Sequence, residues 1–177
     1  MYVYRHELAL WRFCSTDKTR PTLGKILLDG DKAIATDGHR MMIVTTLAEA
    51  ARDVCVGVNI NHAKLALKSR DDVYNTNCTG DILGVGSGII TPFQTHHNSE
   101  FPPWKDFVDE LSHPKPTESV TLNPAYLADL YAYLRDIKEK DVSVDVTLRG
   151  VLGPLTLTTE TPEAQIRYIL MPMLSDA

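Results

Sequence analysis

The sequence has few cysteines, no long hydrophobic run and no excess of basic charge. Its three cysteines, Cys14, Cys55 and Cys78, form no Cys-x-x-Cys pair, which argues against a zinc site and favours reduced thiols. No stretch approaches the roughly 20 apolar residues that a membrane helix needs. The N-terminal segment also lacks the apolar core of a signal peptide. We therefore expect a soluble, cytoplasmic protein.

The balance of charge is slightly acidic. Lys and Arg number 18 and Asp and Glu 23, so the net charge is -5. Such a protein does not coat nucleic acid with its whole surface, although a local basic patch is compatible with this total. With 44% hydrophobic and 23% charged residues, the 177 residues can bury a core as one large or two small domains.

The most regular segment follows residue 118. Residues 119–122 are expected to form a strand, and Asn123-Pro124 supplies a helix cap followed by proline at the first helical position. Apolar residues then recur at helical spacing: Leu127, Leu130, Tyr131, Leu134 and Ile137. Alternation over 142–148 predicts a half-buried strand, and two more strands are expected at 155–157 and 166–171.

The same order, strand, helix and three strands, recurs twice earlier. In the middle, a strand at 54–58 precedes a helix capped by Asn59 and strands at 73–78, 82–85 and 89–93. The first copy has a strand at 2–4, a helix around 7–15 and strands at 23–28, 32–36 and 41–45. Residues 97–118 are rich in proline and predict a linker with one helical turn near 104–111. The fold class expected is α+β, with about three copies of one half-unit.

Three short motifs stand out: ATDGHRM at 35–41, FPPW at 101–104 and YILMPM at 168–173. Together, in this order, they resemble the bacterial DNA polymerase III beta subunit, the sliding clamp family. That family carries an ATDGHRL-like segment in its middle domain, an FPDY-like segment closing that domain and a VMPM-like C-terminus. The resemblance implies the DNA-clamp fold, in which each domain is built from two such half-units.

The resemblance also implies a shortened clamp. Residues 1–111 resemble the middle clamp domain, 112–118 would be a linker, and 119–177 resemble the C-terminal half of the last domain. A clamp ring has twelve half-units and this chain about three, so closure would need four chains. A shortened clamp of this kind fits a phage or mobile-element protein.

In the family, the three motifs line a cleft that accepts short linear peptides from DNA polymerases and repair proteins. The residues that the resemblance places in this cleft are Leu23, Thr36, Gly38, His39, Arg40, Met41, Pro102, Phe107, Ile169, Met171, Pro172 and Met173. Methionine suits a groove that takes several partners, and small apolar pockets can bury Leu or Phe anchors. Alternatively, Asp37-Gly38 is an ordinary hairpin turn and Met41-Met42 are core residues. Asp106 stands where the family usually has a basic residue, so partner preference would differ.

The helices of the family line the inside of the ring and meet the backbone of double-stranded DNA without reading its sequence. The basic residues that would do so here are Arg5, Arg12, Lys64, Lys68, Arg70, Arg135 and Lys138. The alternative is that these side chains simply belong to a solvated helix surface.

No catalytic group, cofactor or metal is expected. His39 has no nucleophile set beside it in sequence, and the adjacent His96 and His97 would point to opposite faces of a strand. The GVGSG segment at 84–88 lacks the lysine of a phosphate-binding loop. The favoured hypothesis is a non-enzymatic processivity factor that encircles DNA as a homo-oligomer, with a tetramer ring as one form. The alternatives are a clamp-like adaptor or competitor without a ring, and an unrelated enzyme with chance motif matches.

Overall fold

The computed structural model describes residues 2–47, 56–68, 71–75, 81–86, 89–97, 101–111, 120–139 and 142–173. The elements are β1 (Tyr2–Tyr4), α1 (Arg5–Leu8), η1 (Ala9–Phe13), η2 (Pro21–Gly24), β2 (Lys25–Asp29), β3 (Lys32–Thr36), β4 (Arg40–Thr46), β5 (Val56–Asn59), α2 (Ile60–Ala66), β6 (Val73–Asn75), β7 (Asp81–Gly86), β8 (Ile89–His97), α3 (Trp104–Glu110), α4 (Pro124–Asp136), β9 (Asp145–Thr147), β10 (Leu155–Glu160) and β11 (Ala164–Leu170). Among the described helices, none is long and apolar enough to cross a membrane.

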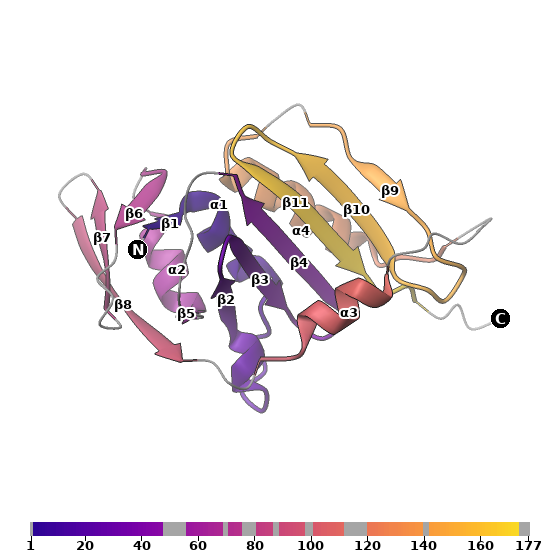
Figure 1. The fold of residues 1–177 in the computed structure, drawn as a ribbon, viewed down its shortest axis with the longest axis horizontal. Coiled ribbons are helices and arrows are strands. Elements are labelled where there is room, and N and C mark those ends of the chain that lie inside the picture. Colours follow the sequence, from indigo (N-terminus) through magenta and orange to yellow (C-terminus); the bar gives the residue numbers. More distant parts are fainter. Residues whose placement is uncertain are drawn as a thin grey trace.

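An antiparallel sheet of nine strands forms the frame of the molecule (Figure 1). Its order is β7-β8-β5-β2-β3-β4-β11-β10-β9, and β1 and β6 pair in a separate small sheet. β4 and β11 pair along their whole lengths, from Arg40 opposite Leu170 to Thr46 opposite Ala164. The first and last parts of the chain are therefore joined directly, strand to strand.

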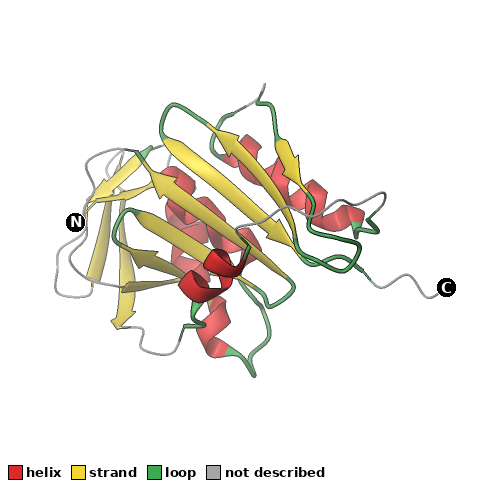
Figure 2. Cartoon of the chain, turned by 45° about the vertical axis from the view of Figure 1, so that its right-hand side comes forward, coloured by secondary structure: helices red, strands yellow, loops and turns green. Residues whose placement is uncertain are grey.

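Helices cover both faces of this sheet (Figure 2). Each face has its own apolar core. α1, η1, α2 and α4 lie on one face, and α3 crosses the other. Successive strand residues point to opposite faces, so Met42 enters the larger core with Tyr133, whereas Met41 enters the smaller core with Trp104. Both methionines are buried, each in a different core.

The strand, helix and three-strand order is confirmed in the first two copies, and the helix starts follow the expected caps. The side-chain oxygen of Asn59 accepts a hydrogen bond from the Asn61 N–H (2.8 Å), and that of Asn123 accepts one from the Ala125 N–H (3.0 Å). The first helix differs in detail, because α1 begins at Arg5 and η1 continues it as a tighter 3-10 turn to Phe13.

The third copy departs from expectation in its strands and in part of the apolar stripe of its helix. Residues 120–122 form no strand, and the carbonyl of Thr121 accepts one hydrogen bond, from the Met173 N–H (2.9 Å). β9 is shorter than expected and lies at the end of the described sheet, beside β10, and its Val146 is 56% exposed. On α4, the expected Leu130, Leu134 and Ile137 do pack on the core, but Leu127 and Tyr131 are 40% and 68% exposed and Tyr133 is buried instead. Residue 119 and the expected linker at 112–118 lie outside the described residues.

Candidate functional site

The first motif forms a tight loop between β3 and β4. The hydroxyl of Thr36 donates to the Arg40 carbonyl (2.7 Å) and accepts from the Gly38 N–H (3.1 Å). One carboxylate oxygen of Asp37 accepts from the N–H groups of His39 (2.9 Å) and Arg40 (3.1 Å). Gly38 has φ +95°, a left-handed conformation that favours glycine. The loop is therefore held by its own side chains.

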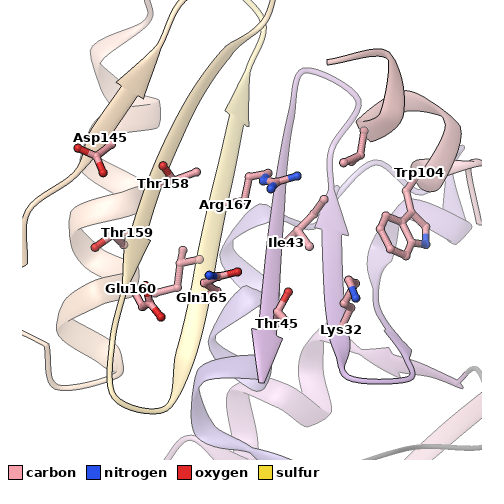
Figure 3. A pocket seen from close by; sticks show the side chains of 12 residues that line it. Lys32, Ile43, Thr45, Trp104, Asp145, Thr158, Thr159, Glu160, Gln165 and Arg167 are labelled. Carbon is pink, nitrogen blue, oxygen red and sulfur yellow. The ribbon is translucent and has the colours of Figure 1, made fainter. Parts of the chain in front are cut away.

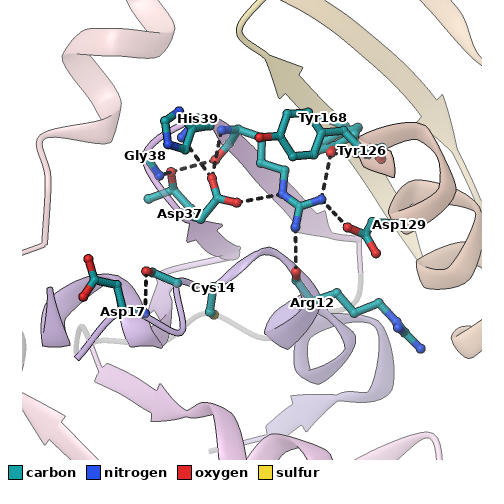
Figure 4. A network of polar contacts seen from close by, with 12 residues as sticks. Arg12, Cys14, Asp17, Asp37, Gly38, His39, Tyr126, Asp129 and Tyr168 are labelled. Atoms are coloured by element: carbon teal, nitrogen blue, oxygen red, sulfur yellow. Dashed lines mark hydrogen bonds and ion pairs between the residues drawn. The ribbon is translucent and has the colours of Figure 1, made fainter. Parts of the chain in front are cut away.

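The side chain of Arg40 fastens this loop to other parts of the chain, and its partners converge in Figure 4. Its guanidinium donates to the Asp37 carboxylate (3.0 Å), the Asp129 carboxylate, the Tyr168 hydroxyl (3.4 Å) and the Arg12 carbonyl (3.1 Å). Asp129 lies on α4 and Tyr168 on β11, so one side chain links the loop to both elements of the C-terminal part. The Arg40 side chain is 9% exposed, which leaves its head group little room for a ligand.

Aromatic rings complete the surroundings of the Arg40 guanidinium. The guanidinium carbon lies 4.8 Å from the ring centre of Tyr126 and 5.3 Å from that of Phe13. Burial by itself would lower the pKa of Arg40, but the hydrogen bonds to Asp129 and Tyr168 raise that pKa above its ordinary value. Burial also raises the pKa of the Tyr168 hydroxyl, although Arg40 opposes this. Arg40 therefore stays charged and Tyr168 neutral at neutral pH.

An apolar pocket of about 300 Å³ lies beside the loop. Its walls come from η2, the β3–β4 loop, the start of α3 and the end of β11: Leu23, Thr36, Gly38, His39, Arg40, Met41, Pro102, Pro103, Trp104, Phe107, Ile169 and Met171. The structure thus brings together all the residues that the family resemblance placed in the cleft, except Pro172 and Met173. Pro103 and Trp104 join them.

Two contacts set the walls of this pocket. Trp104 is buried in the smaller core with Met41 and Ile169, and its main-chain N–H donates to the Pro102 carbonyl (2.7 Å). On the other side, the Met171 N–H donates to the His39 carbonyl (3.1 Å), which holds the end of β11 against the loop. Trp104 was not among the residues expected to line the cleft, although its position at the end of the FPPW motif could have indicated it.

The chemistry of the pocket is that of a binding site for an apolar anchor. Leu23, Met41, Phe107 and Ile169 offer hydrocarbon surface, and Met171 is 41% exposed at the pocket, where a flexible thioether can adapt to a ligand. Asp106 is exposed on α3 and does not line the pocket. Within the described ranges, no three His, Cys, Asp or Glu side chains gather as a metal site would need.

Several basic residues expected to meet DNA already have partners on the helical face. Arg12 pairs with Asp136 (2.7 Å), and Lys138 pairs with Asp72 (2.7 Å). Arg5 donates to the main-chain carbonyls of Asp136 (2.8 Å) and Asp71 (3.3 Å). These contacts neutralise or occupy three of the side chains.

Other basic residues on the helices remain open to a ligand. Lys64, Lys68 and Arg135 are exposed, and none of them forms an ion pair with another residue that the structure describes. The Lys64 ammonium lies 4.3 Å from the ring centre of Trp11. Arg70 lies outside the described residues.

Comparison with known proteins places this arrangement in a known fold. No protein-family model matches the chain, and no protein of curated function matches it in sequence. Its structure is similar to the DNA polymerase sliding clamp of Bacillus subtilis (TM-score 0.69, 14% identity, covering 99% of this chain and 64% of the clamp). It is similar as well to the DNA polymerase III beta subunit of Thermotoga maritima (0.69, 12%, 99% and 65%) and to the C. crescentus beta sliding clamp (0.68, 15%, 99% and 66%).

These comparisons establish the fold and the size of the shared part. The chain has the α+β fold of the bacterial sliding clamps. It spans about two thirds of the length of those clamps, 64% of the Bacillus subtilis protein. Sequence identities of 12–15% show the fold alone.

Proposed function

We propose that this chain is a non-catalytic, clamp-like DNA polymerase processivity factor that holds partner proteins through short peptides bound in the apolar pocket. One observation carries the proposal. Segments far apart in sequence, at 36–41, 102–107 and 169–171, meet around one apolar pocket within a clamp fold. A protein that tethers others needs a binding site and no reacting groups, and an apolar pocket of this size suits the leucine or phenylalanine side chain of a partner.

A peptide-binding assay tests the pocket. The probe is a fluorescent peptide with adjacent leucine and phenylalanine residues, followed by polarisation. Met171→Glu puts a charge at the pocket wall and should weaken binding by about tenfold or more. Leu65→Glu is the matched control, because Leu65 is 46% exposed on α2 and does not line the pocket. Equal affinities for the two variants would refute this site.

We further propose that the chain forms a ring around double-stranded DNA. β7 and β9 end the nine-stranded sheet, and each has one strand partner, so both carry an edge that another copy could pair with. The helical face carries Lys64 on α2, Lys68 just after it and Arg135 on α4, which could contact phosphates inside such a ring. With about three half-units per chain, four copies would complete the family's twelve.

Light scattering over a concentration series tests this assembly. A stable particle of four chains, each of 19.7 kDa, would support the ring. The tetramer should then remain on a closed circular plasmid at high salt and leave it after linearisation. A monomer at every concentration would exclude the self-assembled ring.

A clamp-like adaptor or competitor that forms no ring is the second candidate, and two observations favour it. The pocket is complete within one chain, so peptide binding needs no second copy. Arg12 and Lys138 are paired with carboxylates on the helical face, which reduces its attraction for phosphates. A monomer that binds the peptide probe and does not bind DNA would establish this alternative.

A further inference from the structure

A polar groove crosses the face of the sheet that α3 covers and adjoins the apolar pocket at Trp104, which lines both. Figure 3 shows its side chains spread over β3, β4, β11, β10 and β9. Two cavities, of about 480 and 430 Å³, share Val108, Thr158 and Arg167 and so form one continuous groove. Because its lining residues come from five neighbouring strands, the groove suits an extended polypeptide better than a compact small molecule.

One guanidinium in this groove is held in place by the protein. The Nε–H of Arg149 donates to the Leu111 carbonyl (2.6 Å), which ties the end of α3 to the turn before β10. Its Nη1 donates to the hydroxyl of Thr156 (2.7 Å), a residue that is 4% exposed. These bonds fix the plane of the guanidinium and leave its Nη2 group without a hydrogen bond to any residue that the structure describes.

A second guanidinium lines the same cavity. Arg167 is exposed on β11, and neither it nor Arg149 forms an ion pair within the described part of the chain. Burial and the positive charge of Arg167 both lower the pKa of Arg149. Two cations that repel each other across a cavity lose that repulsion when an anion binds between them.

We propose that Arg149 and Arg167 bind a side-chain carboxylate of an acidic residue in a partner polypeptide that lies along this groove. A planar guanidinium with free N–H groups matches a carboxylate, and the threonine hydroxyls beside it can donate further hydrogen bonds. This inference goes beyond the proposed function, because neither arginine lines the apolar pocket.

The other charges of the groove favour a polypeptide over nucleic acid. Asp109 lines the cavity of the two arginines, and Asp145 and Glu160 line the neighbouring one with Lys32. A nucleic acid would bring a negative charge at every step and be repelled by these carboxylates. A peptide can place one carboxylate at the arginines and neutral or basic residues elsewhere.

The test is a titration of the full-length protein, followed by the side-chain N–H signals of arginine in NMR. The probe is a short peptide with one glutamate and one lysine, and the same peptide with glutamine in place of glutamate is its control. Arg167→Gln, a substitution at an exposed residue, should lower the affinity for the glutamate peptide by about tenfold. Lys18→Gln, an exposed change at a residue that lines neither cavity, should leave its affinity unchanged.

Each other outcome overturns the proposal. Equal binding of the glutamine peptide would show that the carboxylate is not recognised. Binding of inorganic phosphate or duplex DNA that needs Arg167, without binding of the glutamate peptide, would assign the groove to phosphates. Because this probe has no apolar anchor, its failure is independent of failure at the Met171 pocket.

Discussion

Replacing Arg40 by glutamine should destabilise the whole protein. The substitution removes the charge that the carboxylates of Asp37 and Asp129 share and leaves the ring of Tyr126 without its cation. Breaking a fully buried ion pair from one side costs about 3–5 kcal/mol, whereas exposed pairs contribute about 0–1 kcal/mol. The Asp129 side chain is 38% exposed, so water replaces part of the lost interaction. We therefore expect a loss of about 2 kcal/mol in the free energy of unfolding.

Urea denaturation and thermal melting measure this loss. A protein of this size loses roughly 2–4 °C of melting temperature per kcal/mol, so Arg40→Gln should melt roughly 4–8 °C lower. In a double-mutant cycle with Asp129→Asn, the two changes should be non-additive by about 1 kcal/mol, because both break the same contact. Arg135→Gln, an exposed change on α4, should stay within about 0.5 kcal/mol of the parent. The reasoning fails if Arg40→Gln is as mild as Arg135→Gln, or if the cycle shows simple additivity.

Three further predictions concern local features, each measurable on the purified protein. Gly153→Ala should lower the free energy of unfolding by roughly 3 kcal/mol in urea denaturation, because a Cβ there would lie 1.9 Å from the Arg149 carbonyl oxygen. Gly30→Ala, in open space at φ +61°, should lower it by about 1 kcal/mol. Equal losses in the two variants would contradict the clash. Burial raises the pKa of Tyr133, so the contribution of this group to stability should be constant below about pH 10 and fall above it, where the unfolded chain releases this proton first. A slope above about pH 10 that is unchanged in Tyr133→Phe would contradict this. Burial also raises the pKa of the Cys14 thiol, so iodoacetamide at pH 8 should alkylate Cys14 in urea and leave it unmodified in the native protein, as located by peptide mass spectrometry.

Features with strong local signals could be predicted from the sequence. Asn59 and Asn123 begin helices because their side chains cap the first turn, which is a property of a few adjacent residues. The motif at 35–41 forms its loop through contacts among neighbours, with Asp37 and Thr36 as the acceptors. The pocket residues were reached through the family resemblance of three motifs, and the structure brings most of them to one place.

Features that depend on distant residues could not be predicted in this way. Arg40 was expected to face a ligand, but its direction is set by Asp129 and Tyr168, which are 89 and 128 residues away in sequence. On α4, Tyr131 was expected on the apolar face, but packing against the rest of the chain buries Tyr133 and leaves Tyr131 exposed. The pairing of basic side chains with carboxylates from other elements was likewise invisible in the sequence.

The pairing of β4 with β11 has a consequence for synthesis of the protein. Arg40 and its opposite residue Leu170 leave the ribosome 130 residues apart, since 170 − 40 = 130. At about 5–20 residues per second, β4 is synthesised roughly 7–26 s before its neighbour. During that interval its hydrogen-bonding edge is open to other nascent chains and to chaperones. Ile169 and Met171 line the pocket, so the pocket is complete only after β11 has paired with β4. A chain that binds a partner in this pocket must therefore have its last strand in place.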